Sequence, residues 1–204
     1  MPSTNKEMVE DLKRLGVLKS SEIVDALLQI DRKKFLKPEQ HEHAYDDTPL
    51  PTLSGQTISQ PYTVAFMLEL LKPKKGLKVL DVGSGSGWTT VLLAELVGEK
   101  GRVTGTEIIP ALVQLGRDNL KKFKHKNVKI DQAIENELGK KGEMFDRILV
   151  SASALEMPEE LINQLSPGGV MVIPVGENII RLEKTNDEKI ITKEYPGFVF
   201  VPLV

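Results

Sequence analysis

A glycine-rich turn constrains the fold of this chain more than any other feature of its sequence. The turn reads Asp81-Val82-Gly83-Ser84-Gly85-Ser86-Gly87 and follows the apolar segment 78–82. Glycine adopts backbone angles that other residues avoid, so such a turn can be tight and a ligand can lie against its backbone. From residue 78 onward short apolar segments alternate with helical patterns, which predicts a mostly parallel sheet. A glycine turn at the carboxyl end of a strand in such a sheet predicts a ligand site.

The rest of the pattern predicts an α/β fold with a doubly wound sheet. The expected strands are 78–82, 102–107, 128–130, 147–150, 170–175, 179–184, 189–193 and 198–201, and the expected helices are 89–97, one starting at 110, and 159–165. The last strands follow one another without helices, which favours antiparallel pairing at one edge. Helical spacing of apolar residues before residue 73 predicts an N-terminal helical extension, with a loop at 44–57. We expect a single domain, 1–204, in which 1–77 holds the helices and the loop and 78–204 the ligand-binding core.

Composition excludes several classes of chemistry. The 204 residues contain no cysteine, which excludes disulfides, cysteine–metal sites and thiol nucleophiles. The chain has 27 Lys and Arg against 29 Asp and Glu, a net charge of −2, so no strong field is expected to recruit nucleic acid or anionic lipid. No apolar run is long enough for a bilayer, and the N-terminus does not resemble a signal peptide. We therefore expect a cytoplasmic protein with no nucleic-acid or membrane partner.

Two acidic residues indicate which ligand the glycine turn binds. Glu107 ends the second strand, 20 residues after Gly87, where a carboxylate can accept hydrogen bonds from both hydroxyls of a ribose. Asp81, two residues before the first glycine, would repel a diphosphate but attract an ammonium group. Both features favour S-adenosylmethionine, which carries a ribose and an amino acid but no phosphate. A nicotinamide dinucleotide, whose usual motif is G-x-G-x-x-G, and a turn without a ligand remain the alternatives. No metal site is expected, because His41-Glu42-His43 lacks the spacing of helical zinc ligands.

Several motifs resemble one methyltransferase family. They are Gly55-Gln56-Thr57-Ile58-Ser59-Gln60-Pro61, the glycine turn, Glu107-Ile108-Ile109-Pro110, Phe145-Asp146, the stretch 165–176 and the closing Phe200-Val201-Pro202-Leu203. From about Ile23 to the C-terminus the chain is similar to the protein-L-isoaspartate O-methyltransferase family. The resemblance implies a Rossmann-like methyltransferase fold, S-adenosyl-L-methionine as cofactor, and Ser59 at the position of the active-site serine.

The resemblance and the turn together predict the site residues. We expect the cofactor to contact Asp81, Gly83, Ser84, Gly85, Gly87, Glu107, Ile108 and Ile134, and the substrate to contact Thr57, Ile58, Ser59 and Val175. An acceptor carboxylate is already ionised at neutral pH, so no general base is needed. Placement of the reactants, which can contribute roughly 7–11 kcal/mol, remains the main task. Ser59 is accordingly predicted to orient the carboxylate by one hydrogen bond, without forming a covalent bond.

One stretch departs from the family pattern. The Gly-Asp-Gly triplet that usually follows the third strand, and whose aspartate is expected to contact adenine, is replaced by Ala133-Ile134-Glu135. A carboxylate from Glu135 or Asp131, or backbone groups, would have to take over that contact. Trp88 stands where many relatives have tyrosine, and we expect it to pack between helix and sheet.

The family resemblance implies a specific reaction. The chain is expected to methylate the free carboxylate of L-isoaspartyl residues in damaged proteins and peptides, which initiates repair through a succinimide. The partners would be isoaspartyl peptides in extended conformation, and the protein is expected to be a monomer. Two alternatives remain open, namely a paralogous O-methyltransferase acting on another peptide carboxylate and a non-catalytic S-adenosylmethionine-binding protein.

Overall fold

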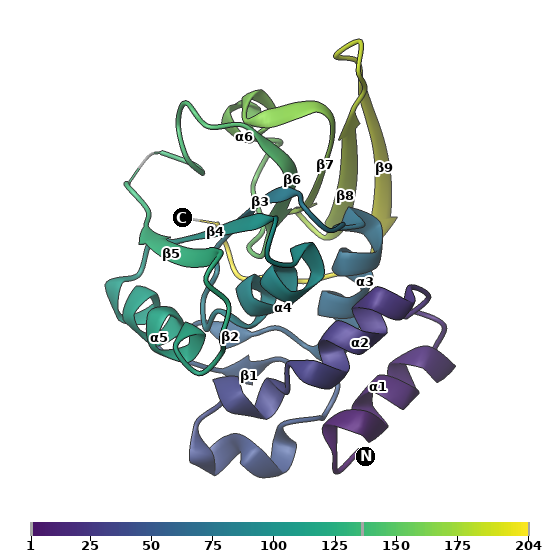
Figure 1. Cartoon of the computed structure of the whole chain (residues 1–204), viewed down its shortest axis with the longest axis vertical. Helices are drawn as coiled ribbons and strands as arrows, with labels where there is room; N and C mark the ends of the chain where they lie inside the picture. Colours follow the sequence, from purple (N-terminus) through teal and green to yellow (C-terminus); the bar gives the residue numbers. More distant parts are fainter. Residues whose placement is uncertain (1, 136, 204) are drawn as a thin grey trace.

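A seven-stranded sheet forms the centre of the protein in the computed structural model, which describes residues 2–135 and 137–203 (Figure 1). The strand order is β5-β4-β3-β6-β7-β8-β9. The strands are β3 (Lys78–Val82), β4 (Arg102–Glu107), β5 (Val128–Gln132), β6 (Phe145–Val150), β7 (Leu165–Val175), β8 (Asn178–Lys184) and β9 (Ile190–Pro196). Strands β3 to β7 pair in parallel, and β8 and β9 add antiparallel at one edge. The predicted fold class is confirmed.

Successive residues of the central strands belong to two separate hydrophobic cores. Val79 and Leu149 pack into the core that also contains α3 and α4, whereas Leu80 and Ile148 pack into the core that contains α6. A strand alternates its side chains between faces, so strands buried on both sides read as continuous apolar runs. The helices are α3 (Pro61–Leu71), α4 (Trp88–Val97), α5 (Pro110–Leu120), which packs on β4 and β5, and α6 (Glu159–Asn163).

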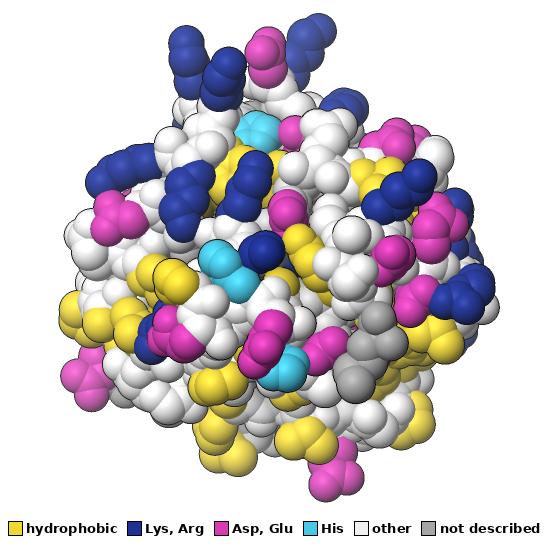
Figure 2. Space-filling model, turned by 90° about the horizontal axis from the view of Figure 1, so that it is seen from below, with side chains coloured by type: hydrophobic (Ala, Val, Ile, Leu, Met, Phe, Trp, Pro, Cys, Tyr) yellow, Lys and Arg dark blue, Asp and Glu magenta, His cyan; other side chains and the backbone are white. Residues whose placement is uncertain are grey.

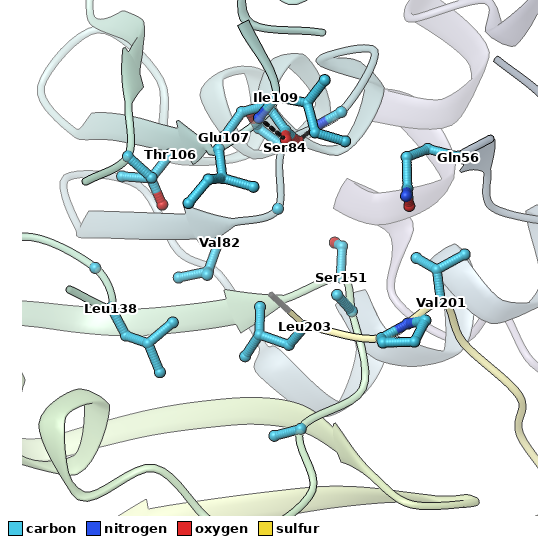
Figure 3. Close-up of a pocket in the computed structure, with 18 of the residues that line it drawn as sticks. Gln56, Val82, Ser84, Thr106, Glu107, Ile109, Leu138, Ser151, Val201 and Leu203 are labelled. Atoms are coloured by element: carbon cyan, nitrogen blue, oxygen red, sulfur yellow. Dashed lines mark hydrogen bonds between the residues drawn. The ribbon is translucent and has the colours of Figure 1, made fainter. Parts of the chain in front are cut away.

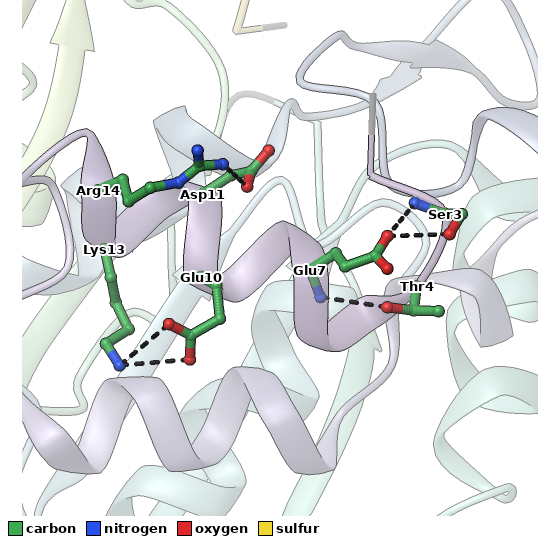
Figure 4. A network of polar contacts seen from close by, with 7 residues as sticks. All are labelled: Ser3, Thr4, Glu7, Glu10, Asp11, Lys13 and Arg14. Carbon is green, nitrogen blue, oxygen red and sulfur yellow. Dashed lines mark hydrogen bonds and ion pairs between the residues drawn. The ribbon is translucent and has the colours of Figure 1, made fainter.

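The N-terminal helices share the first of these cores. They are α1 (Asn5–Arg14), α2 (Ser21–Gln29) and the short 3₁₀ helices η1 (Arg32–Phe35) and η2 (Pro38–His43). Two reciprocal hydrogen bonds cap the start of α1. Glu7 N donates to Thr4 Oγ1 at 3.2 Å, and the Glu7 carboxylate accepts from Ser3 N at 2.7 Å (Figure 4). Met8 and Leu12 of the same helix are buried against the sheet's core. The extension therefore packs on the core as one continuous apolar layer.

Two sequence expectations about secondary structure were wrong. Residues 198–201 form no strand: Phe198 instead stacks on Phe66 of α3, with ring centroids 5.1 Å apart. Phe198, Phe200 and Val201 are half-buried and Val199 is exposed, so the run is held on one side by packing and joins no strand ladder. The helix expected over 159–165 ends at Asn163, because Leu165 already pairs with Phe145 at the start of β7.

The expected loop at 44–57 contains a small hairpin. Its strands are β1 (Leu50–Pro51) and β2 (Thr57–Ile58), which pair antiparallel.

Figure 2 shows the molecule from below the view of Figure 1, and acidic and basic side chains are intermixed over this face. No helix within the described residues is long and apolar enough to cross a membrane.

Candidate active site

A cavity of about 880 Å³ opens at the carboxyl ends of β3, β4 and β6 (Figure 3). Strand β3 lies between β4 and β6, so the strand order reverses there, and this is where open α/β sheets bind ligands. The lining comes chiefly from residues 56–59, 82–86, 106–109, 133–135, 137–139, 151–152, 154–160 and 201–203. Segments far apart in the sequence thus meet around one cavity.

The glycine turn forms one wall. Gly83 N and Ser84 N both donate to Thr106 O, at 2.9 and 3.1 Å, which ties the turn to the neighbouring strand. Gly83 and Gly85 have φ angles of 74° and 51°, a region that favours glycine. Ser84 Oγ is buried at this wall with no hydrogen-bond partner among the described residues. The hydroxyl packs toward Gly105 of β4, so Ser84 meets the cavity through its other atoms.

Glu107 lies at the end of β4 beside the turn. Its Oε2 accepts from Gly85 N and its Oε1 from Ile109 N, both at 2.9 Å. The two backbone bonds fix the plane of the carboxylate, which is 6% exposed and lines the cavity. Each carboxylate oxygen keeps a further lone pair for a ligand, so two neighbouring hydroxyls can bind side by side.

Asp81 lies outside the cavity lining that the structure describes. Its side chain is fully buried, and Oδ2 accepts from Thr89 Oγ1 at 2.8 Å and from Thr90 Oγ1 at 2.6 Å. Burial raises the pKa of Asp81 to about 6, and the nearby charge of Glu107 adds to this effect. Asp81 therefore holds the start of α4 against the turn, and its cofactor contact stays a prediction. Its Oδ1 is buried without a partner in the described chain.

Two further predicted residues also lie off the cavity wall. Gly87 has a φ of 83° and precedes α4, where it lets the turn pass into the helix. Val175 pairs with Asn178 in the β7–β8 ladder and forms a bridge with Ala154. The lining includes the remaining predicted cofactor contacts: Gly83, Ser84, Gly85, Glu107, Ile108 and Ile134.

The β1–β2 hairpin brings the acceptor residues to the same cavity. Thr57, Ile58 and Ser59 all line it, together with Gln56. None of the described lining residues is a histidine, the usual base of an activated serine, and no hydrogen bond joins the Ser59 hydroxyl to a carboxylate among the described residues. This arrangement suits a hydroxyl that donates a hydrogen bond and not one that attacks.

The C-terminal segment closes the site, a position that the sequence reasoning did not assign to it. Val201, Pro202 and Leu203 line the cavity beside Ser151 (Figure 3). Ser153 N donates to Val201 O and Leu203 N donates to Ser153 O, both at 2.8 Å. The signal was the closing Phe-Val-Pro-Leu motif, which was recognised as a family feature but not as part of the site.

The structure distinguishes between the two carboxylates considered for adenine. Asp131 is paired with Lys129 and Lys140, at 2.7 and 2.9 Å, and does not line the cavity. Glu135 is exposed and lines it. Backbone bonds fix the approach to this loop, since Ala133 N donates to Glu107 O at 2.8 Å. Of the two, Glu135 is the carboxylate that lines the cavity.

The described lining carries charge of one sign. Six carboxylates contribute to it, those of Glu107, Glu135, Glu137, Glu156, Glu159 and Glu160, and the described lining offers no cationic side chain to oppose them. Walls of one charge sign concentrate ligands of the opposite sign. The lining therefore favours a positively charged ligand over a diphosphate. No group of three or more His, Asp or Glu within the described residues could hold a metal ion.

The fold matches solved methyltransferase structures. One, from Plasmodium falciparum and described as a protein-L-isoaspartate O-methyltransferase in complex with S-adenosyl-L-homocysteine, is 32% identical and has a TM-score of 0.87, covering 98% of each chain. A second structure described as a protein-L-isoaspartate O-methyltransferase is 25% identical, with a TM-score of 0.85 and coverage of 98% of this chain and 66% of that one. The fold and the site together define a Rossmann-like methyltransferase.

The sequence comparisons then identify the family. The family model for protein-L-isoaspartate(D-aspartate) O-methyltransferase matches residues 3–204. The protein-L-isoaspartate O-methyltransferase of Methanopyrus kandleri is 43% identical, covering 98% of this chain and 90% of the relative. That of Thermococcus onnurineus is 42% identical, with coverage of 96% and 91%. The chain belongs to the protein-L-isoaspartate(D-aspartate) O-methyltransferase family, which also excludes the nicotinamide alternative.

Proposed function

We propose that this chain transfers the methyl group of S-adenosylmethionine to the free carboxylate of L-isoaspartyl residues in peptides and damaged proteins. The observation that carries the proposal is that the glycine turn with Glu107 and the hairpin with Ser59 line one cavity. Donor and acceptor can therefore meet without leaving the site. A backbone amide nitrogen would then attack the methyl ester and expel methanol to form a succinimide, whose hydrolysis returns part of the material to normal aspartate.

The donor wall fits S-adenosylmethionine by its chemistry. When bound, this cofactor supplies a methyl group on a positively charged sulfur. Glu107 presents two oriented oxygens for the ribose hydroxyls, and the glycine turn lines the cavity beside it. The acidic lining favours the sulfonium and ammonium charges over a diphosphate. We infer that Glu135, which lines the cavity, accepts a hydrogen bond from the adenine amino group.

The acceptor wall has to place one carboxylate oxygen in line with the methyl–sulfur bond. We infer that Ser59 Oγ donates a hydrogen bond to the acceptor carboxylate and fixes its rotation. A single neutral donor leaves the other oxygen free to attack, and correct placement of two reactants contributes roughly 7–11 kcal/mol. Thr57 and Ile58 line the cavity beside Ser59 and would contact the acceptor peptide.

A direct assay tests the reaction. A peptide with one isoaspartyl residue is compared with its aspartyl twin at equal concentration, and methyl ester formation is followed by mass spectrometry. We expect methylation of the isoaspartyl peptide alone. Calorimetric titration with S-adenosylmethionine and with its demethylated product measures cofactor binding independently.

The same experiments separate the alternatives. Cofactor binding without methylation of either peptide would favour a non-catalytic binding protein. Methylation of another carboxylate, with the isoaspartyl peptide left unmodified, would favour a paralogous O-methyltransferase. A methylated or acylated Ser59 would overturn the orienting role. The monomeric state and the cytoplasmic location stay predictions, to be tested by sedimentation velocity and by cell fractionation.

A further inference from the structure

Arg32 is a buried cation that hydrogen-bonds to backbone carbonyls alone. Its exposed fraction is 0%, although arginine is rarely buried without a partner. Nη1 donates to Ala44 O at 2.9 Å and Asp46 O at 3.3 Å, and Nη2 donates to Thr48 O at 2.9 Å and Ser59 O at 3.1 Å. All four terminal N–H groups of the guanidinium are thus used, each on a different carbonyl.

These carbonyls come from the two ends of the β1–β2 hairpin. Three of them belong to the segment 44–48, which leads into the hairpin, and the fourth belongs to Ser59, directly after it. Arg32 therefore joins both ends at the base of the hairpin. The segment that carries the acceptor wall is closed by one side chain from η1.

The segment 44–48 is held on its other side as well. Within this segment the carbonyls of Ala44, Asp46 and Thr48 accept from Arg32. The side chains of the two residues between them form hydrogen bonds with other partners. Tyr45 donates through its hydroxyl to Asp31 Oδ1 at 3.1 Å, and Asp47 Oδ1 accepts from Tyr62 N at the start of α3 at 2.8 Å. The alternation leaves the segment little freedom to shift relative to α3 or η1.

The same guanidinium also contacts the part of the site that holds the proposed methyl donor. Its central carbon lies 5.4 Å from the centroid of the Trp88 ring, within the range of a cation–π contact. Trp88 is the first residue of α4, directly after the glycine turn; it is 1% exposed and also lines the cavity. Arg32 thus contacts both the element that carries Ser59 and the element that follows the cofactor turn.

We propose that Arg32 is a positioning residue that sets the distance of Ser59 from the methyl donor. The inference rests on the proposed function, because it assigns Ser59 to the acceptor. Arg32 does not line the cavity among the described residues, so it acts through the backbone of the hairpin and not on the substrate.

The chemistry of the site explains why arginine stands there. Burial lowers the pKa of Arg32 to about 10, opposed by the charges of Asp47 and Asp46, so the group stays protonated at neutral pH. Apolar residues often stabilise a core as well as buried charges do, so stability alone does not call for a cation. Lysine has three N–H groups on one nitrogen and cannot span four carbonyls in a planar fan.

The test compares three variants of the full chain. Arg32→Met removes every donor but keeps most of the apolar stem, and Arg32→Lys keeps the charge. Arg147→Met is the matched control, because Arg147 is a half-buried arginine on β6 that also donates to backbone carbonyls, those of Lys72 and Asp146, away from the cavity. Measurements are kcat and KM for the isoaspartyl peptide, cofactor Kd, amide hydrogen exchange and the fluorescence of Trp88, the single tryptophan of the chain.

Misplacing a reactant by about 1 Å can cost on the order of 100-fold, so we expect kcat to fall roughly 100-fold in Arg32→Met and roughly 10-fold in Arg32→Lys. The Kd for the cofactor should stay within about 3-fold of the wild-type value, since Glu107 and the glycine turn are unchanged. Exchange should accelerate over residues 44–59 and not in the central sheet, and Trp88 emission should change. Arg147→Met should leave kcat and the exchange of 44–59 at wild-type values.

Two results would overturn the proposal. One is wild-type kcat, or wild-type exchange over 44–59, in Arg32→Met. The other is exchange that accelerates evenly over the sheet and the hairpin, which would make Arg32 a general stabilising residue. If Arg32→Met does not fold, the same criteria apply to Arg32→Lys. An inactive wild-type protein would refute the proposed function instead, and the exchange and Kd measurements would still decide whether Arg32 fixes the hairpin.

Discussion

The substitution Glu107→Gln tests the cofactor site by replacing one carboxylate oxygen with an NH₂ group. The Glu107 carboxylate accepts a backbone N–H on each oxygen, from Gly85 and from Ile109, at 2.9 Å. Glutamine keeps the shape of the side chain but offers one accepting oxygen and one NH₂ donor. One of the two backbone amides must then lose its hydrogen-bond acceptor. One ribose hydroxyl likewise loses a charged acceptor.

The structure sets the expected size of both effects. Glu107 is buried, and an unsatisfied buried donor costs about 1–3 kcal/mol, so the unfolding free energy without ligand should fall by that amount. A hydrogen bond to a charged group contributes about 1.5–3 kcal/mol, and each 1.4 kcal/mol changes an equilibrium tenfold. The Kd for S-adenosylmethionine should therefore rise about 10- to 100-fold.

Calorimetric titration measures this Kd, and urea unfolding measures the stability. The demethylated product carries the same ribose, so its Kd should rise by the same factor, and kcat at saturating cofactor should stay near that of the wild type. Glu160→Gln is the control, because Glu160 lines the same cavity but is exposed, and its removal changes the charge alone. A Glu107→Gln variant that binds the cofactor within about 3-fold of wild type would refute the assignment of the ribose to Glu107.

Three other predictions follow from the site. Ser59→Ala should lower kcat on the order of 10-fold, the value of one hydrogen bond, without changing cofactor Kd; an equal loss of affinity would contradict its acceptor role. Because burial raises the pKa of Asp81 to about 6 from its ordinary 3.8, the folded wild type keeps a proton that the unfolded chain has already released. Wild-type stability relative to Asp81→Asn should accordingly fall by roughly 3 kcal/mol between about pH 4 and pH 7, and parallel urea midpoints across that range would rule this out. Because the lining is acidic, a peptide with lysines beside the isoaspartate should have a lower KM at low salt than the same peptide with glutamates there. The difference should shrink at about 1 M salt, where the Debye length is about 3 Å. Equal KM values at low salt would show that the acidic lining does not select peptides.

The parts of the site that follow from short-range rules were predictable. The turn 83–87 joins a buried strand to a helix, and Glu107 ends the next strand, so a parallel sheet must bring them to the same edge. Hairpin residues 57–59 were placed by family resemblance and not by periodicity, since two-residue strands give no pattern to detect. In each case the information lies within a few residues along the chain.

Asp81 shows a feature of the geometry that the motif does not predict, namely the direction of its side chain. Its position two residues before the glycines indicated a ligand contact, but in β3 it shares a face with Val79, toward α4 and Thr89 and Thr90. The alternation of side chains along the strand determines the face on which Asp81 lies, whereas the glycine motif by itself does not. Burial then raised its pKa, an effect that depends on everything packed around it.

By itself the sequence determined the class of fold, the order of strands and helices and the chemistry of the donor site, because apolar periodicity, glycine freedom and the position of one carboxylate are local properties. Tertiary structure alone decided that the C-terminal residues 201–203 close the cavity and that Arg32 holds the acceptor hairpin. The partners of Arg32 are carbonyls 12 to 27 residues away, and every residue has a carbonyl. No side-chain pattern marks which carbonyls a buried guanidinium will meet, since only the folded path of the backbone brings them together.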